Sequence, residues 1–418
     1  SRKNKFLVGV SPLGLLALSA CGGGSTSSGG GAVAVFSSTS GKGQSGPLNN
    51  ATVFLDYDLD GVYDVGETTT TTDADGNYYF DGLAGHGALP TSNTYQIVVT
   101  TTLDQFGNSA TTDSTIGGIV SDIHLIAPSG ADNAFNGANV MVTPATTMIS
   151  NLMALDSTLS ASDAQTNVAK ALGFVDANGD VTINPLTFDA FDPQQKGTQA
   201  YDDLARQAEK TSKKIMTVVN TLAAAAEGSG ASQADAFSAA MGSVTQVLST
   251  KIANMSIAGK TAAEQVLNFD DTTDISAITT QLSSDLADIA NSSQAAFNEL
   301  KTTIELSISN VVAAIELISD IDDTQSTFQT IALVSAQVKA AAQNATSNLS
   351  DANLYVGQDA DGISVAAQVA NNALLVVGGA LATSGSVTNT VAQQVTITSS
   401  GDDSGISFYI IGKDASGA

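Results

Sequence analysis

The chain has 418 residues, and its 41 acidic and 15 basic side chains give a formal net charge of −26 at pH 7. Such an excess of negative charge repels nucleic acids and anionic lipids, which excludes a protein that binds either of them through basic residues. The single cysteine excludes an intramolecular disulfide, and we expect a bound metal ion to serve as a cross-link instead.

The first segment has the pattern of a secretion signal. Basic residues at positions 2, 3 and 5 precede an apolar run that ends in Leu-Ser-Ala at positions 18–20, directly before Cys21. The run is too short to span a bilayer comfortably and is typical of a signal peptide. Its end resembles the bacterial lipobox, which implies removal of residues 1–20 and acylation of Cys21; the alternative is a free buried cysteine. Gly22 follows in place of aspartate, and by resemblance to lipoprotein sorting patterns this favours the outer membrane.

Residues 21–46 are rich in Gly, Ser and Thr and contain few apolar side chains. They cannot bury enough apolar surface to offset the entropy of ordering, so they are predicted to form a flexible tether. The tether would hold the folded part away from the membrane.

Residues 56–67 carry the strongest chemical motif in the chain. They match the calcium-loop pattern D-x-[DN]-x-[DN]-G-x₅-E at every specified position. Calcium takes six to eight oxygen ligands, and such a loop supplies them from alternate side chains, one backbone carbonyl and a closing glutamate. Gly61 occupies the position where the chain turns sharply and a Cβ would obstruct it. The predicted ligands of Ca²⁺ are Asp56, Asp58, Asp60, the carbonyl of Val62, Asp64 and Glu67. The less favoured alternative is an acidic turn without an ion.

Strands, not helices, are predicted on both sides of this loop. Residues 51–55 alternate and are partly β-branched, and a threonine run and Tyr-Tyr-Phe at 78–80 follow the loop. Pro-Leu-Asn-Asn-Ala-Thr-Val at 47–53, the acidic loop, and Thr-Asp-Ala-Asp-Gly-Asn-Tyr-Tyr-Phe-Asp-Gly-Leu at 72–83 together resemble the B-type β-sandwich modules of bacterial surface adhesins, as in the serine-aspartate repeat family. The resemblance implies an extracellular, calcium-rigidified sandwich with a spacer or structural role and no catalysis.

A second acidic segment follows shortly after. Asp73, Asp75 and Asn77 fit either a second, weaker metal site or an ordinary Asp-Gly-Asn turn, and the sequence leaves both open. Further along, the acidic segment at 176–180 lacks a closing glutamate and is predicted to be a turn.

The β pattern extends to residue 127, and residues 128–198 are predicted to form a linker with short helices. Thr143 followed by Pro144 is a good helix start, and apolar residues at helical spacing then continue to Gly173. This segment is similar to linker-helical segments of large bacterial surface proteins.

Residues 199–350 are predicted to form an α-helical bundle or stalk. Apolar stripes at helical spacing indicate helices over 199–226, 232–255, 274–321 and 327–349. The third, if unbroken, would be about 70 Å long. A membrane-inserting stripe is the alternative, but polar residues interrupt every turn, and a spanning helix needs ~20 consecutive apolar residues.

The alternating pattern returns in residues 351–418, which are predicted to form a partial β-sandwich; Asp359 and Asp361 are assigned to a turn. The predicted fold class is therefore multi-domain α+β. It comprises an N-terminal β-sandwich over 47–127, a central bundle of long helices and a C-terminal partial β-sandwich.

The residues do not favour an enzyme. His86 and His124 are the only histidines, and neither has a Ser or Asp partner at a recognisable spacing. The sequence favours a lipid-anchored, calcium-stabilised bacterial cell-surface protein with a structural or adhesive role. It would contact the membrane only through the anchor. Its target would be a surface protein, a matrix protein or a glycan, and it would bind no nucleic acid. The alternative is an envelope receptor or assembly partner whose helical region binds a small ligand or another surface protein.

Overall fold

The computed structural model describes residues 38–92, 94–105, 109–115, 118–119, 123–128, 139–316 and 343. These residues belong to the first of two compact units, 1–379 and 380–418. The predicted signal peptide, Cys21, most of the helix predicted at 327–349 and the C-terminal β segment lie outside the described residues.

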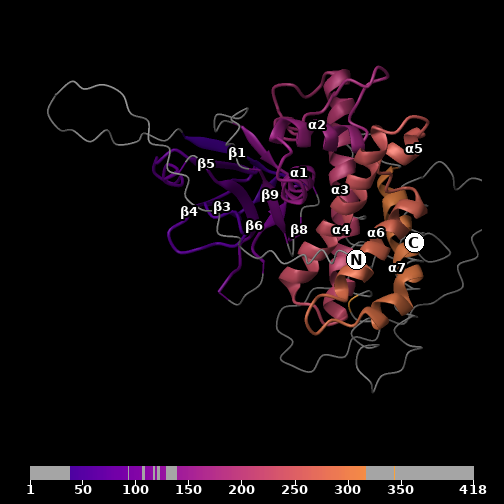
Figure 1. Ribbon diagram of the computed structural model, residues 1–418. Helices are drawn as coiled ribbons and strands as arrows, with labels where there is room; N and C mark the ends of the chain where they lie inside the picture. Colours follow the sequence, from indigo (N-terminus) through magenta and orange to yellow (C-terminus); the bar gives the residue numbers. More distant parts are fainter. Residues whose placement is uncertain are drawn as a thin grey trace, which may run out of the picture. The chain divides into compact units, whose positions relative to one another are not determined.

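Strands precede helices along the described chain, and the α+β class is confirmed there (Figure 1). The strands are β1 (Thr39–Gly43), β2 (Leu48–Asn49), β3 (Ala51–Asp56), β4 (Thr68–Thr71), β5 (Asn77–Phe80), β6 (Gln96–Thr101), β7 (Thr112–Asp113), β8 (Gly118–Ile119), β9 (His124–Ala127) and β10 (Val140–Val142). They form three sheets with the orders β10-β1-β5, β2-β7-β8 and β4-β3-β6-β9. The β1–β10 pair is parallel and the other described pairs are antiparallel.

The four-stranded sheet holds the predicted calcium loop. Its central strand β3 pairs with β4 on one edge and β6 on the other, with Val53 opposite Val99. Both valines are fully buried, as expected for β-branched residues in a central strand. The edge strand β9 is covered by the helix that follows it, because the N–H of Ile126 donates to Thr147 Oγ1 at 2.9 Å and its carbonyl accepts from Thr146 Oγ1 at 2.8 Å. The edge is thereby closed to pairing with another chain.

The prediction that residues 21–46 form a tether is wrong for residues 39–43. These residues form β1, which lies between β5 and β10. Their glycine content reflects close packing, since a Cβ on Gly41 would lie 1.8 Å from the carbonyl oxygen of Val140 and 2.6 Å from the hydroxyl oxygen of Tyr78. That hydroxyl donates to the Val140 carbonyl at 2.9 Å and so ties β5 to β10 past the glycine.

The helices in the described part of the chain are α1 (Pro144–Leu155), α2 (Ala161–Ala171), α3 (Gln199–Gly228), α4 (Gln233–Met255), α5 (Ala262–Gln265), α6 (Thr272–Leu286) and α7 (Gln294–Glu316). Thr143 caps α1 as predicted, with reciprocal bonds to Thr146 in a capping box. Helices α3, α4, α6 and α7 pack side by side, and α3 and α6 each contact the other three (Figure 1). None of the described helices combines the length and hydrophobicity that a membrane-spanning helix requires.

The prediction of one long helix over 274–321 is wrong. The chain leaves helical geometry after Leu286, Asn291 has a φ of +65°, and α7 begins at Gln294. Helix α7 runs back along α6. Two contacts show this, since Ser283 Oγ donates to Asn298 Oδ1 at 2.6 Å and Lys301 lies beside Thr280. Asn and Ser at positions 291–293 are typical turn residues, and the reversal lets both apolar stripes face the bundle core.

The hydrophobic core is continuous from the sheets to the helices. One cluster of buried side chains extends from Leu48 in β2 to Val312 in α7, and it includes Met148 and Ile149 of α1. Helix α1 contacts β9 on one side and α4 on the other. The predicted domain boundaries at 127/128 and 198/199 divide this core.

Candidate metal centre

The acidic loop connects the inner strand β3 to the edge strand β4, so it begins at the end of a strand that is paired on both sides. Asp56, its first residue, is the last residue of β3 and pairs with Gln96 of β6. Its side chain is completely buried. The position of this carboxylate is therefore set by the sheet.

Hydrogen bonds fold the loop around the Asp56 carboxylate. One oxygen accepts from the Leu59 N–H at 2.7 Å, and the other accepts from the Gly61 N–H at 2.7 Å and from Gln96 Nε2 at 2.5 Å. An aspartate that binds the backbone shortly after itself in this way is a standard turn-former. The turn brings Asp58 and Asp60 back toward Asp56.

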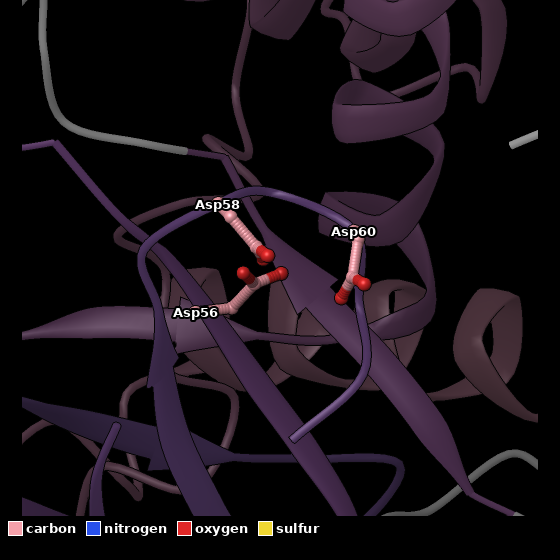
Figure 2. A group of neighbouring side chains, drawn as sticks. All are labelled: Asp56, Asp58 and Asp60. Atoms are coloured by element: carbon pink, nitrogen blue, oxygen red, sulfur yellow. The ribbon is translucent and has the colours of Figure 1, made fainter. Parts of the chain in front are cut away.

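Three of the predicted ligands come together as a result. One carboxylate oxygen from each of Asp56, Asp58 and Asp60 lies within 4.8 Å of the others, and Figure 2 shows the three carboxylates pointing into the loop. Burial raises the pKa of Asp56, and a hydrogen bond shared with Asp58 raises it further, although Gln96 and the loop N–H groups oppose this. Oxygen-only carboxylate donors suit a hard cation such as calcium.

The predicted closing ligand lies across the same loop. Glu67 Oε1 accepts from the Tyr57 N–H and Oε2 from the Asp64 N–H, each at 2.9 Å. Burial raises the pKa of Glu67, and the negative charges of Asp56 and Asp58 add to the increase. Glu67 is therefore within electrostatic reach of the cluster. The side chains of Val62 and Asp64 are exposed.

Gly61 meets the conformational requirement expected of it. Its φ is +80°, and a Cβ would lie 3.2 Å from His124 Nε2 of β9. His124 is a neighbour of the loop that the sequence pattern did not reveal, and Gln96 is a second. Burial lowers the pKa of His124, which favours the neutral imidazole. Both residues are distant in sequence, so only the pairing of β3, β6 and β9 could have identified them.

The second acidic segment is organised as a turn. Asp73 Oδ1 accepts from the Asp75 N–H at 2.9 Å and the Asn77 N–H at 2.8 Å, and the Asn77 amide also binds it. Within the residues that the structure describes, the Asp56–Asp58–Asp60 group is the only set of three such ligands that converge.

The other acidic segment and the first histidine have local partners. Asp176 Oδ1 accepts from the Asn178 N–H at 2.8 Å and the Asp180 N–H at 3.0 Å, consistent with the predicted turn. His86 does have an aspartate partner, contrary to the expectation, since its Nδ1 lies 2.9 Å from Asp81 Oδ1. The pair is on the surface, and the imidazole stacks on Tyr79 with ring centroids 4.6 Å apart.

No protein-family model matches the chain, and comparisons with curated proteins and with solved structures found no match. Function must therefore be inferred from the residues and their geometry.

Proposed function

We propose that the chain is a lipid-anchored, calcium-stabilised protein of the bacterial cell surface with a structural or adhesive, non-catalytic role. In this proposal residues 47–127 act as a B-type module like those of serine-aspartate repeat adhesins. The observation that carries the proposal is the convergence of Asp56, Asp58 and Asp60 at the end of a central strand.

Calcium would relieve the repulsion among these carboxylates. Asp56, Asp58, Asp60 and Glu67, with Asp64 and the Val62 carbonyl, would hold the ion and cross-link the β3–β4 loop. Extracellular modules bind calcium with a Kd of about 10⁻⁴–10⁻³ M, so a site of this class fills substantially where calcium is millimolar. This dependence agrees with the secretion signal and with Cys21 as the anchor.

Calorimetric titration and thermal melting of the full chain test the calcium site. Calcium at ten times its Kd should stabilise the fold by about 1.4 kcal/mol and raise the Tm by a few degrees. Glu67→Gln should weaken binding, whereas Glu299→Gln, which alters an exposed glutamate on α7, should not. Absence of both heat and a Tm shift would show that the loop is only an acidic turn.

The anchor and the surface location need their own measurements. Cys21→Ala should leave the protein unprocessed or release it into the medium. Mass spectrometry that finds an unacylated Cys21 at the mature N-terminus in membrane fractions would refute the anchor. Crosslinking on intact cells in calcium, followed by capture of the partners, tests the adhesive role. External protease added to intact cells tests surface display, and a chain that the protease does not cleave would contradict it.

A cavity in the helical region favours the receptor as a second candidate. It has a volume of about 570 Å³ and lies between α3 and the segment 262–270. Its lysines already have partners, as Lys214 lies 2.8 Å from Asp270 and 2.5 Å from Glu316. A ligand there would have to displace these ion pairs. Because salt screens the ion pairs, ligand binding that becomes tighter as the ionic strength rises would support this candidate.

A further inference from the structure

A second cavity lies on the strand side of the fold. It has a volume of about 730 Å³, which is within the usual range of ligand sites, and it opens between the β10-β1-β5 sheet and the segment 187–195 that leads to α3. None of the proposed calcium ligands lines it.

The floor of the cavity is one face of β1 and β5. The antiparallel register places Ser40 opposite Tyr79 and Lys42 opposite Asn77, and all four residues line the cavity. Residues that alternate along paired strands share a face, so these side chains form one surface. Tyr79 is 36% exposed, and its ring is held by stacking on His86, with an angle of 20° between the ring planes.

The wall of the cavity is fixed before any ligand arrives. Asp189 lies 2.6 Å from Lys42 Nζ and accepts from Gln44 Nε2 at 2.7 Å, which ties the wall to β1. The Tyr201 hydroxyl donates to the Asp189 carbonyl at 2.6 Å and accepts from the Asp192 N–H at 2.8 Å. A ligand therefore does not have to order this segment, which lowers the entropic cost of binding.

The charges of the lining disfavour an anionic ligand. Among the described residues of the lining, Lys42 is the one cationic side chain, and Asp189 neutralises it. Asp75 and Asp192 add negative charge. Phosphate, carboxylate and nucleotide ligands would meet repulsion without a free basic partner.

The carboxylate of Asp192 is already supplied with donors. It accepts from the Gln194 N–H and from Gln195 Nε2, each at 2.9 Å, and these bonds lower its pKa. These donors stabilise the negative charge of Asp192 without a cationic ligand. What remains is a polar surface of carboxylate oxygens and amides beside an exposed aromatic ring.

We propose that this cavity binds a neutral oligosaccharide. Sugar hydroxyls both donate and accept, so they can pair with carboxylate oxygens, with the side-chain amide of Gln194 and with the side-chain carbonyl oxygen of Asn77, whose amino group binds Asp73. The C–H faces of a pyranose ring pack on aromatic rings, and Tyr79 offers such a ring. The assignment rests on the proposed adhesive function, for which it names the class of target.

Isothermal titration of the full chain in calcium, with cellotriose, maltotriose and triacetylchitotriose as neutral probes, tests the proposal. 3′-Sialyllactose and spermidine serve as the anionic and cationic probes. At least one neutral probe should bind. Tyr79→Ala and Gln194→Ala should each weaken it about tenfold or more, equivalent to about 1.4 kcal/mol. Tyr79→Phe keeps the ring and should retain binding, as should Gln199→Ala, which changes an exposed glutamine outside the cavity.

Each variant is checked by circular dichroism and by its calcium-dependent Tm shift, so that misfolding is separated from lost contacts. The proposal is overturned if all three neutral probes bind more weakly than about 10 mM. It is also overturned if Tyr79→Ala and Gln194→Ala bind like the wild type, or if spermidine or sialyllactose binds more tightly. Failure of sugar binding with an intact calcium response rejects this assignment alone, whereas a missing calcium response in the wild type rejects the calcium-stabilised module.

Discussion

Lys213 of α3 links the helices to the strands through a buried group of charges, and its replacement is the most informative single change. Its Nζ lies 2.5 Å from Asp113 Oδ2 of β7 and 3.4 Å from Glu209 Oε1, one helical turn earlier. The side chains of Lys213, Asp113 and Glu209 are only 11%, 3% and 4% exposed. Lys213→Met preserves most of the volume but leaves two buried carboxylates without a cation.

Removal of one partner from a buried ion pair costs about 3–5 kcal/mol, because the remaining charge stays desolvated. We expect Lys213→Met to lower the free energy of unfolding by about this amount at pH 7. Lys260→Met is the matched control, since Lys260 and Glu264 form a surface pair 32% and 42% exposed. Surface pairs contribute at most about 1 kcal/mol.

The loss should depend on pH in a defined direction. Burial raises the pKa of Glu209, and the Lys213 charge opposes that increase. The folded state thus holds the Glu209 proton more tightly than the unfolded state does, so stability declines as the pH rises through the folded pKa. Without Lys213 this pKa rises further, and the gap between variant and wild type should widen from pH 5 to pH 8.

Urea unfolding followed by circular dichroism at pH 5, 6.5 and 8 measures this effect. One cooperative transition is expected for the wild type, because the charges and the core join the strands to the helices. A loss no larger than that of Lys260→Met, or a loss independent of pH, would refute the reasoning. Separate transitions for strands and helices would show that the two regions are not coupled.

Three further predictions concern two glycines, the cap of α1 and the acidic loop. Gly61→Ala should lower the free energy of unfolding in urea by about 1–2 kcal/mol, because the φ of Gly61 is +80°. Gly242→Ala, in α4 with open space around it, should raise that free energy by about 0.5–1 kcal/mol. Equal effects of the two changes would contradict this reasoning. Thr143→Ala should cost about 1 kcal/mol through loss of the α1 cap, and an unchanged urea midpoint would argue against it. The raised pKa values of Asp56 and Glu67 mean that, at these two groups, the folded state without calcium keeps protons that the unfolded state releases, so the Tm in EDTA should fall relative to the Tm in calcium as the pH rises above about 4. Calcium should suppress that fall, and parallel Tm profiles with and without calcium would disprove the link.

The sequence was most informative where structure depends on local pattern. The start of α1 follows from Thr143 and Pro144, and the apolar stripes predicted α3 and α4 to within a few residues. The break between α6 and α7 was missed because the stripe keeps helical spacing through a turn of seven residues, 287–293. The turn residues were present, but only packing against α3 and α4 makes the reversal favourable.

The acidic loop and the cavity differ in how far apart in the sequence their residues lie. The spacing of Asp56, Asp58 and Asp60 is local, so the sequence predicted that they meet. The cavity joins Lys42 to Asp189, which are far apart in the chain, and no periodicity records that contact. Strand β1 was missed for a related reason, since its glycines are required by the neighbours β5 and β10 and not by its own pattern.

The central place of β1 has a mechanical consequence. A load applied through the residues before Thr39 enters the fold at one end of this strand, which is hydrogen-bonded on both edges. Because those bonds lie across the strand direction, a pull along β1 strains them together in shear. An edge strand pulled sideways would instead open one bond at a time. In a protein tethered by its N-terminal side, β1 would therefore act as the clamp that resists extraction of the chain under force.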